Sequence, residues 1–214
     1  MARPIPTPVF HFTRVEHLDT IVAQGVACDR QAQANGLLRI EVGNAGIKAR
    51  RAQRLVPESP KGVVSDYVPF YFAPRSPMMY SIHRGNVPGY TEGTGRLVYL
   101  VTTLEALLEA GLDPILTDRN AVLQFASFHQ LRMGEPVDDF IDWPLMKQPM
   151  WNNTDSDPDR MERRMAECLV HGAVPWSAIQ YVGAKSDAVA DEIRARLGDE
   201  SERVRIEVRR TWYF

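Results

Sequence analysis

Val68-Pro69-Phe70-Tyr71-Phe72-Ala73-Pro74-Arg75-Ser76-Pro77-Met78-Met79-Tyr80 is the stretch of this chain that says most about its fold. Apart from Pro69, its first five residues are of types enriched in strands, so residues 68–72 are predicted to form one. Pro74 ends that strand. Ser76-Pro77 then supplies the residue types preferred at the cap and first turn of a helix. The stretch is therefore predicted to run strand, turn and helix.

The same order of elements recurs on both sides of this stretch. Towards the N-terminus, residues 9–13 read as a strand, and the apolar residues that follow at helical spacing predict a helix that ends at Gly25. Towards the C-terminus, residues 96–101 form a nearly continuous apolar run, which is typical of a central buried strand, and Thr103 is placed to cap the next helix. The pattern indicates an α+β or mixed α/β fold.

The last part of the chain continues the alternation. Residues 179–182 and 204–208 are predicted strands, and they flank a helix that starts at Ser186-Asp187. With 214 residues and no long linker, the chain is expected to be a single domain, residues 1–214.

Two segments lack regular hydrophobic periodicity. Residues 31–54 contain Asn35-Gly36 and a Gly43–Gly46 turn, and they are predicted to be a mobile loop with a helical end. Residues 135–159 contain four prolines, and an irregular stretch of that length in a compact domain indicates a function.

Charge is distributed unevenly although the net charge is only −2. Residues 39–54 have a net charge of +4, because Glu41 is the only acid among five bases, Arg39, Lys48, Arg50, Arg51 and Arg54. Residues 135–159 have a net charge of −6, with Lys147 as the only base. Any contact with nucleic acid must therefore come from local clustering of basic residues.

Several functional classes lack their sequence signals. The chain has no P-loop, no nucleophile elbow, no zinc-protease motif and no dinucleotide-binding glycine motif. Its histidines and two cysteines show no metal-ligand spacing, so no metal is expected. No apolar run is long enough to span a bilayer, and no signal peptide is visible, which makes a cytoplasmic protein without membrane contact the expectation.

Three segments together resemble one known family. They are Phe10-His11-Phe12-Thr13 with the helix after it, the stretch from Val68 to Tyr80, and Arg163-Arg164-Met165-Ala166-Glu167-Cys168-Leu169-Val170. In order and spacing they are similar to the DarT toxins, which attach ADP-ribose from NAD to thymine in single-stranded DNA. The resemblance covers nearly the whole chain. It implies an ADP-ribosyltransferase-like domain, in which helices flank a central mixed, mostly antiparallel sheet.

The resemblance also assigns roles to individual residues. Glu167 and Arg51 are the expected catalytic residues, with Arg51 preferred over Arg50. The expected NAD-binding residues are His11, Phe12, Thr13, Thr20, Arg51 and Tyr71. Residues 31–54 would cover NAD, and residues 129–166 would select the target. The family pairs with an antitoxin that carries a macrodomain, so such a partner is expected here.

The chemistry of NAD cleavage fits these residue types. Breaking the nicotinamide–ribose bond builds positive charge on the ribose, and a carboxylate such as Glu167 stabilises that charge more in the transition state than in the ground state. His11 can hydrogen-bond a ribose hydroxyl, and the ring of Tyr71 can stack on nicotinamide.

Ordinary structural roles compete with each assignment. His11 between two phenylalanines and Tyr71 in an apolar strand are residues that commonly just pack, and Glu167 could form a helical ion pair with Arg163. Trp143 and Trp151 could stack on an unpaired base or could anchor their loop to the core. The joint occurrence in family order favours function for Glu167, His11 and Tyr71.

Two other functions remain open from the sequence. The chain could be a transferase that modifies protein, because only the target loop would differ. It could also be a non-enzymatic nucleic-acid module, built on residues 39–54 and on the arginines of the last strand, Arg203, Arg205, Arg209 and Arg210. That module would need no role for Glu167.

Overall fold

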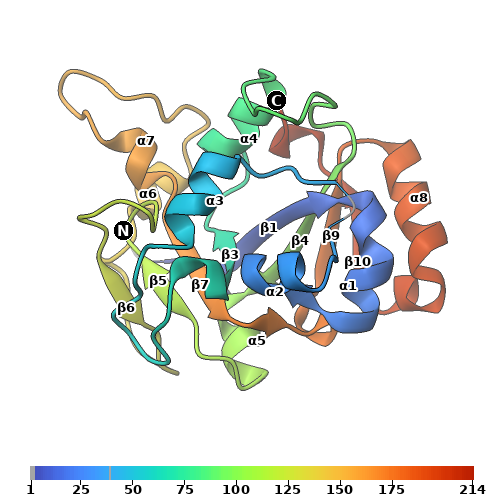
Figure 1. Cartoon of the computed structure of the whole chain (residues 1–214), viewed down its shortest axis with the longest axis horizontal. Helices are drawn as coiled ribbons and strands as arrows, with labels where there is room; N and C mark the ends of the chain where they lie inside the picture. The colour runs from blue at the N-terminus through green and yellow to red at the C-terminus, as the bar shows by residue number, and fades with distance from the viewer. Residues whose placement is uncertain (1–2, 39) are drawn as a thin grey trace.

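A computed structural model describes residues 3–38 and 40–214 and is built around one eight-stranded sheet (Figure 1). The strands follow the order β10-β9-β4-β1-β3-β7-β5-β6. Their bounds are β1 Pro8–Arg14, β3 Tyr67–Tyr71, β4 Leu97–Thr103, β5 Ile115–Thr117, β6 Phe128–Gln130, β7 Glu167–His171, β9 Tyr181–Ala184 and β10 Arg205–Val208. A separate two-stranded sheet joins β2, Val26–Ala27, to β8, Ala173–Val174.

Every neighbouring pair in the large sheet is antiparallel except β9 and β10, which are parallel. The expected mixed, mostly antiparallel sheet is therefore confirmed. Parallel neighbours in a sheet need a long crossover connection. The parallel pair has one, since β9 and β10 are joined through α8.

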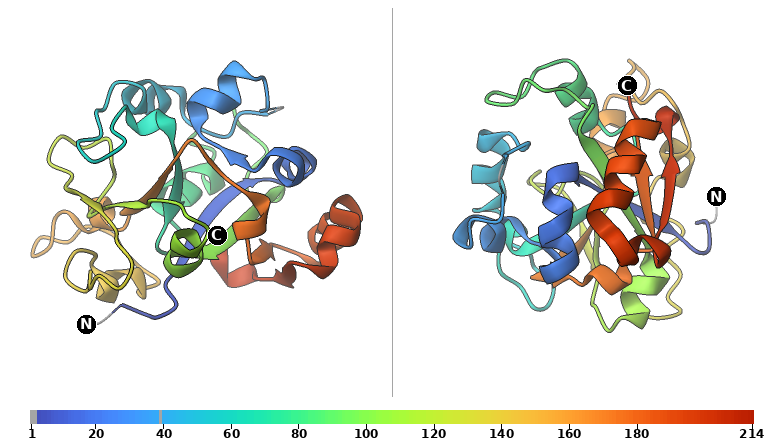
Figure 2. Two further views of the ribbon diagram at one scale, coloured as in Figure 1. Left: turned by 90° about the horizontal axis from the view of Figure 1, so that it is seen from below. Right: turned by 90° about the vertical axis from the view of Figure 1, so that its right-hand side faces the viewer.

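Short helices surround this sheet. Their bounds are α1 Leu18–Gln24, α2 Asp29–Ala34, α3 Ala45–Arg51, α4 Pro77–His83, α5 Leu104–Glu109, α6 Trp143–Met146, α7 Arg160–Arg163 and α8 Asp187–Leu197. α1 and α8 lie side by side next to the β9–β10 edge (Figure 2, right). α6 and α7 lie on the same side of the molecule as β5 and β6 (Figure 1).

The predicted strand, turn and helix of the opening stretch are confirmed. β3 ends at Tyr71, and α4 begins at Pro77 with Ser76 as its cap. The Ser76 hydroxyl accepts a hydrogen bond from the Met79 backbone N–H at 3.2 Å, which satisfies one of the donors that a helix start leaves free. Gly25 likewise ends α1 with a φ of 81°, where a side chain would be strained.

The core confirms that β4 is a central strand. Along β4, successive residues alternate between two apolar clusters, one containing Val98 and Leu100 and the other containing Leu97, Tyr99 and Val101. Because neighbouring side chains of a strand point to opposite faces, β4 is covered on both sides. This explains its continuous apolar run.

The sheet divides between β1 and β3. β1 pairs with β4 along its whole length, from Pro8 to Arg14, whereas it pairs with β3 only where Phe10 lies opposite Tyr71. β3 in turn pairs with β7 from Tyr67 to Tyr71. The two halves of the sheet therefore diverge beyond that one pair, and residues at the divergence can meet a ligand.

The irregular segments contain more structure than the sequence predicts. Residues 31–54 end in a helix, α3, as expected, but they also begin inside α2. Arg39 of the basic run lies outside the described residues. β5 and β6 are short strands that no sequence pattern predicted.

Candidate active site

Glu167 is the first residue of β7, and its side chain is buried with 1% exposure. Its backbone N–H donates to the hydroxyl oxygen of Thr117 at 3.0 Å. Its carboxylate oxygens Oε1 and Oε2 lie 3.2 and 2.9 Å from Nη1 of Arg51. Tyr71 lies directly opposite Glu167 on β3, at the point where the sheet divides. A buried carboxylate held by a guanidinium therefore faces the divergence of the strands.

Arg51 comes from the last turn of α3 and is 7% exposed. Its Nε lies 3.9 Å from a carboxylate oxygen of Asp29, and its Nη2 is buried with no hydrogen-bond partner among the residues that the structure describes. Burial lowers the pKa of Arg51, but attraction and hydrogen bonding by Glu167, with Asp29, outweigh burial and raise it above its usual value. The guanidinium is thus charged and keeps one donor available. Arg50 is exposed, so the preference for Arg51 agrees with the geometry.

His11 bridges the two halves of the sheet. Its Nδ1 lies 2.9 Å from the carbonyl oxygen of Pro69 on β3. Because a carbonyl only accepts hydrogen bonds, Nδ1 donates, and Nε2 of the neutral ring is left as an acceptor. Burial lowers the pKa of His11, and the nearby charge of Arg51 acts in the same direction. His11 is therefore neutral near pH 7 and can accept a hydrogen bond from a hydroxyl.

Tyr71 and Phe12 place an aromatic surface beside Glu167. Their rings are stacked, with centroids 6.3 Å apart and planes 18° apart. Burial, followed by the charge of Glu167, raises the pKa of Tyr71, so its hydroxyl stays protonated. That hydroxyl donates to the sulfur of Met78 at 3.7 Å. A flat apolar ring such as nicotinamide would find complementary surface here.

The two threonines of the expected NAD site are less tightly linked to Glu167. The Thr13 hydroxyl contacts Nδ1 of His17 at 2.9 Å, and Thr20 is a half-buried residue of α1. No contact with the Glu167–Arg51 pair involves either of them in the described part of the chain. Their part in binding NAD stays a prediction.

Both tryptophans of the target segment anchor it to the core. Trp143 is 2% exposed and packs edge-on against Phe72 at 5.4 Å. Trp151 is 5% exposed, and its Nε1 donates to the Arg75 carbonyl oxygen at 2.8 Å. Neither presents a free ring face, so the anchoring interpretation holds and the base-stacking interpretation is wrong for both.

The proposed helical ion pair between Glu167 and Arg163 is also wrong. Glu167 belongs to a strand, and Arg163 instead contacts three acids of the target segment, Asp142, Asp157 and Asp159. Arg163, just outside residues 135–159, therefore neutralises part of the negative charge of that segment.

The arginines of the last strand are also engaged with acids. Arg203 pairs with Glu200, Arg205 and Arg209 pair with Glu207, and Arg210 pairs with Asp187. In the basic loop, Arg51 is buried against Glu167. The pairing of these C-terminal arginines and the burial of Arg51 weigh against a nucleic-acid module built on them.

Sequence reasoning missed two residues that hold the site in place, Thr117 and Arg164. The Thr117 hydroxyl accepts from Glu167 and donates to the Arg119 carbonyl oxygen at 2.7 Å. No motif marks it, because β5 itself was not predicted.

Arg164 is 4% exposed, and burial lowers its pKa to about 10. Its guanidinium donates to four backbone carbonyl oxygens, those of Leu145, Met146, Gln148 and Pro74, at 2.6–3.1 Å. It fastens the target segment to the end of the β3 segment. Its place in the Arg163-Arg164 pair just before Glu167 was the only available signal.

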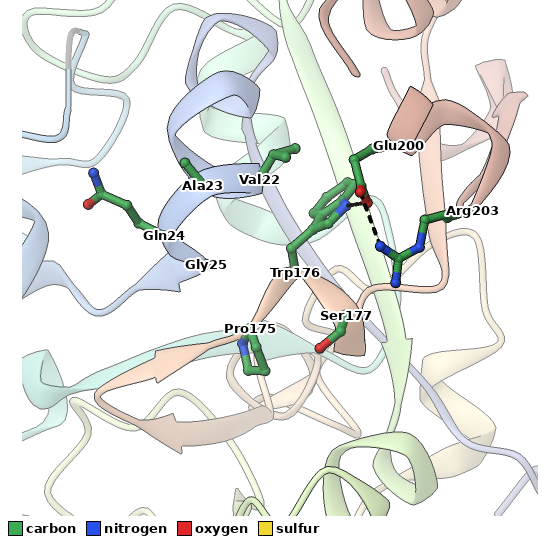
Figure 3. Close-up of a pocket in the computed structure, with 9 residues that line it drawn as sticks. All are labelled: Val22, Ala23, Gln24, Gly25, Pro175, Trp176, Ser177, Glu200 and Arg203. Carbon is green, nitrogen blue, oxygen red and sulfur yellow. Dashed lines mark hydrogen bonds and ion pairs between the residues drawn. The ribbon is translucent and has the colours of Figure 1, made fainter. Parts of the chain in front are cut away.

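One surface pocket lies away from this site. It has a volume of about 440 Å³ and is lined by the end of α1 and by Trp176, Glu200 and Arg203, whose side chains are joined through Glu200 (Figure 3). It shares no lining residue with the site around Glu167. In the described ranges 3–38 and 40–214, the structure has no group of three or more His, Cys, Asp or Glu residues placed to hold a metal. The same residues contain no helix of the length and apolar character that crossing a membrane requires.

Comparison with known proteins supplies the family. A family model described as "ssDNA thymidine ADP-ribosyltransferase, DarT" matches residues 10–214. The chain belongs to the DarT family. A "DNA ADP-ribosyl transferase" of Thermus sp. (strain 2.9) is 35% identical over 214 residues, covering 99% of this chain and 98% of the relative.

Solved DarT structures share the fold. Thermus sp. 2.9 DarT in complex with ADP-ribosylated ssDNA superposes with a TM-score of 0.89 at 32% identity, over 100% of this chain and 99% of that one. Thermus sp. 2.9 DarT in complex with NAD+ superposes with a TM-score of 0.85 at 31% identity, over 99% and 100% of the two chains. The expected DarT resemblance and ADP-ribosyltransferase fold are confirmed.

Proposed function

We propose that this chain transfers ADP-ribose from NAD to a thymine base in single-stranded DNA, with Glu167 and Arg51 as its catalytic residues. The observation that carries the proposal is the buried Glu167–Arg51 pair at the divergence of β1 and β3. Membership of the DarT family and the likeness to relatives with NAD+ or modified ssDNA support it. An ion pair with a purely structural role would not need to lie at the divergence of β1 and β3.

The residues at the divergence suit NAD, which is a substrate because the reaction consumes it. Nη2 of Arg51 is a buried donor without a partner among the described residues, Nε2 of His11 is an acceptor, and the Tyr71–Phe12 pair is aromatic. An anionic, hydroxyl-rich molecule with a flat ring matches this set. His11 would accept from a ribose hydroxyl, while Tyr71 and Phe12 would hold the nicotinamide ring.

The carboxylate of Glu167 accounts for bond cleavage. When the bond between the ribose carbon and nicotinamide breaks, its electron pair leaves with nicotinamide, and positive charge develops on the ribose. A buried, preorganised carboxylate stabilises that charge more than water would, because the site is shielded from solvent. Arg51 holds Glu167 in place through Nη1.

The acceptor base must lose a proton. A thymine ring nitrogen that attacks the ribose carbon forms the new bond and gives up its hydrogen, which Glu167 can take as a general base. In a duplex that nitrogen is engaged in pairing, so reaching it costs unstacking and unpairing. Single-stranded DNA is therefore the expected substrate. Nη2 of Arg51 is placed to steady the negative charge that develops on the base.

Two segments complete the single domain that we propose for residues 1–214. Residues 31–54 would cover NAD, and within them Ile40 and Val42 pack against the same apolar cluster as Phe12 does. Residues 129–166 would select the target, and Arg164 ties them to the Pro74 carbonyl close to Tyr71.

Incubation with labelled NAD tests the function. The parent chain should label a single-stranded oligonucleotide that contains thymine, leave a thymine-free strand and the annealed duplex nearly unlabelled, and leave a competing protein mixture unlabelled. Glu167→Gln should bind NAD and transfer nothing. Label on protein instead of DNA would support the alternative transferase. Binding of the oligonucleotide without any transfer would support the non-enzymatic module.

The macrodomain antitoxin and the cytoplasmic location stay predictions. Co-expression with a macrodomain protein that removes ADP-ribose from DNA should restore growth to cells that express the parent chain. The Glu167→Gln chain should need no such partner.

A further inference from the structure

A group of aromatic rings lies on the surface next to the β3–α4 turn. Tyr80 and His83 project from α4, and Phe214 meets both of them, with ring centroids 5.0 and 5.9 Å away. Tyr80 also contacts Trp151 edge-on at 6.0 Å. Tyr80 is 41% exposed, which is high for a large aromatic side chain in a folded protein.

Arg75 stands beside these rings. It lies in the turn between β3 and α4 with a left-handed φ of 55°, and the bond from Trp151 to its carbonyl oxygen helps hold that conformation. Its guanidinium carbon lies 4.3 Å from the centre of the Phe214 ring. Its Nε is buried and has no hydrogen-bond partner among the described residues. The group is thus a cation that lies over an aromatic ring.

The arginines of this part of the molecule form no ion pair with an acid among the described residues. Within the described part of the chain, no carboxylate lies within ion-pair distance of Arg75, Arg84 or the buried Arg164. The charge of Arg75 also contributes to the lowered pKa of Arg164, after burial, so the two cations lie close enough to repel each other. An anion beside Arg75 would relieve that repulsion. Arg163, by contrast, is surrounded by three aspartates.

The surface is continuous with the reaction site. The Tyr71 hydroxyl donates to Met78, which lies in the first turn of α4. The Arg75 backbone N–H donates to the Tyr99 hydroxyl at 3.4 Å, and the Tyr99 ring packs against Phe12 at 5.9 Å. A strand that passes close to Tyr71 therefore has α4 and Arg75 nearby.

We propose that the surface formed by Arg75, Tyr80, His83, Arg84 and Phe214, the Arg75 surface, binds the DNA strand next to the modified thymine. Arg75 contacts a backbone phosphate, and Tyr80 stacks on a neighbouring base. The proposal rests on the proposed function, and it adds where the single-stranded DNA runs beside the reaction site. Uncompensated arginines beside exposed rings match a single strand, which offers phosphates and unpaired bases together. An acidic peptide offers only the charge.

Oligonucleotide affinity tests the proposal. The probe is a fluorescent single-stranded oligonucleotide with one thymine, flanked by nucleotides other than thymine. Tyr80→Ala should weaken its binding about tenfold, as expected for loss of one base stack. Arg75→Gln should weaken binding and should reduce the slope of log affinity against log salt by ~0.7, the value for one phosphate contact on a single strand. Arg203→Gln, in an exposed arginine on a different surface, is the matched control and should leave both quantities unchanged.

An abasic strand separates stacking from charge. Removing the bases that flank the thymine should weaken parent binding by the same factor as Tyr80→Ala, and Tyr80→Ala should then lose nothing more. NAD binding, followed by thermal shift, should be equal in all variants, and circular dichroism should show the parent fold. Tyr80 lies on the surface, so this variant stays informative if Arg75→Gln fails to fold.

The outcomes separate the two proposals. Parent-like DNA affinity and labelling in both Arg75→Gln and Tyr80→Ala would overturn the Arg75 surface and leave the transferase standing. A parent chain that neither binds nor labels single-stranded DNA would overturn the proposed function, and the surface with it. Equal competition by an acidic peptide and by the oligonucleotide, with no effect of the abasic flanks, would also reject a DNA site.

Discussion

Replacing Thr117 by valine should damage the active site without touching any charged residue. Thr117 is fully buried, and its hydroxyl accepts the Glu167 backbone N–H at 3.0 Å while it donates to the Arg119 carbonyl at 2.7 Å. Valine keeps the shape and removes both bonds. The buried backbone N–H of Glu167 and the partly buried carbonyl of Arg119 then lose their partner, and a fully buried group of this kind costs ~1–3 kcal/mol.

The loss at the buried Glu167 N–H and the smaller loss at the partly buried Arg119 carbonyl together should lower the free energy of unfolding by roughly 2–4 kcal/mol. For a chain of this size, that corresponds to a fall in melting temperature of roughly 5–15 °C. Transfer should fall by at least about tenfold, because Glu167 is no longer fixed, and a displacement of ~1 Å can cost about 10²-fold in rate. Thr117 acts through Glu167 and is therefore a positioning residue.

Thr102 provides a matched control. It is as buried as Thr117, but its hydroxyl has no hydrogen-bond partner among the described residues. Thr102→Val should therefore leave the melting temperature unchanged or slightly raised and should leave transfer unchanged. Scanning calorimetry and labelled-NAD transfer at saturating DNA measure both effects. Equal melting temperatures and equal rates for the two valine variants would refute the role of the Thr117 hydroxyl.

Three further predictions concern charged and titratable groups. Arg51→Lys should reduce transfer at least about 100-fold, because one ammonium cannot replace a guanidinium that contacts Glu167 and keeps a second donor, whereas the exposed Arg50→Lys should stay within about twofold; the reverse ranking in a transfer assay would contradict the assignment. Burial lowers the pKa of His11 below its usual 6.5, so the unfolded chain takes up this proton first as the pH falls, and the free energy of unfolding should decrease below that pH. Urea titrations above and below pH 6.5 should show a smaller decrease in His11→Asn, and an identical decrease would mean that His11 is not neutral in the fold. Arg164→Met should lower the free energy of unfolding by ~3–5 kcal/mol, because the carbonyl groups of Met146, Gln148 and Pro74 lose the donor that Arg164 supplies; a melting temperature equal to that of exposed Arg194→Met would reject this.

Local sequence patterns were sufficient for the main strands and for the helix caps. Ser76, Thr103 and Ser186 each accept the expected backbone N–H, because capping depends only on residues within one turn. β4 was found because a run buried on both faces is apolar at every position. β5 and β6 were missed because strands of three residues are too short to show a period.

The site depends on contacts between distant residues, which local patterns do not encode. Arg51 and Glu167 are 116 positions apart in the chain, and only the family resemblance paired them before the structure did. The order of the strands, which places Tyr71 opposite Glu167, was equally inaccessible. The Arg75 surface combines a turn, a helix and the far end of the chain, and no short motif spans those parts.

The division of the sheet between β1 and β3 has a mechanical consequence. Backbone pairing there is limited to Phe10 and Tyr71, with the His11 side chain as an added tie, so the two half-sheets are less firmly joined than any other neighbouring pair in the middle of the sheet. A ligand that contacts His11 on one half and Glu167 on the other would work as a cross-brace. Binding of such a ligand should make the two halves unfold as one unit. Amide hydrogens of both β1 and β3 should then exchange more slowly with the ligand bound than without it. In this chain, binding of the substrate would itself make the sheet rigid.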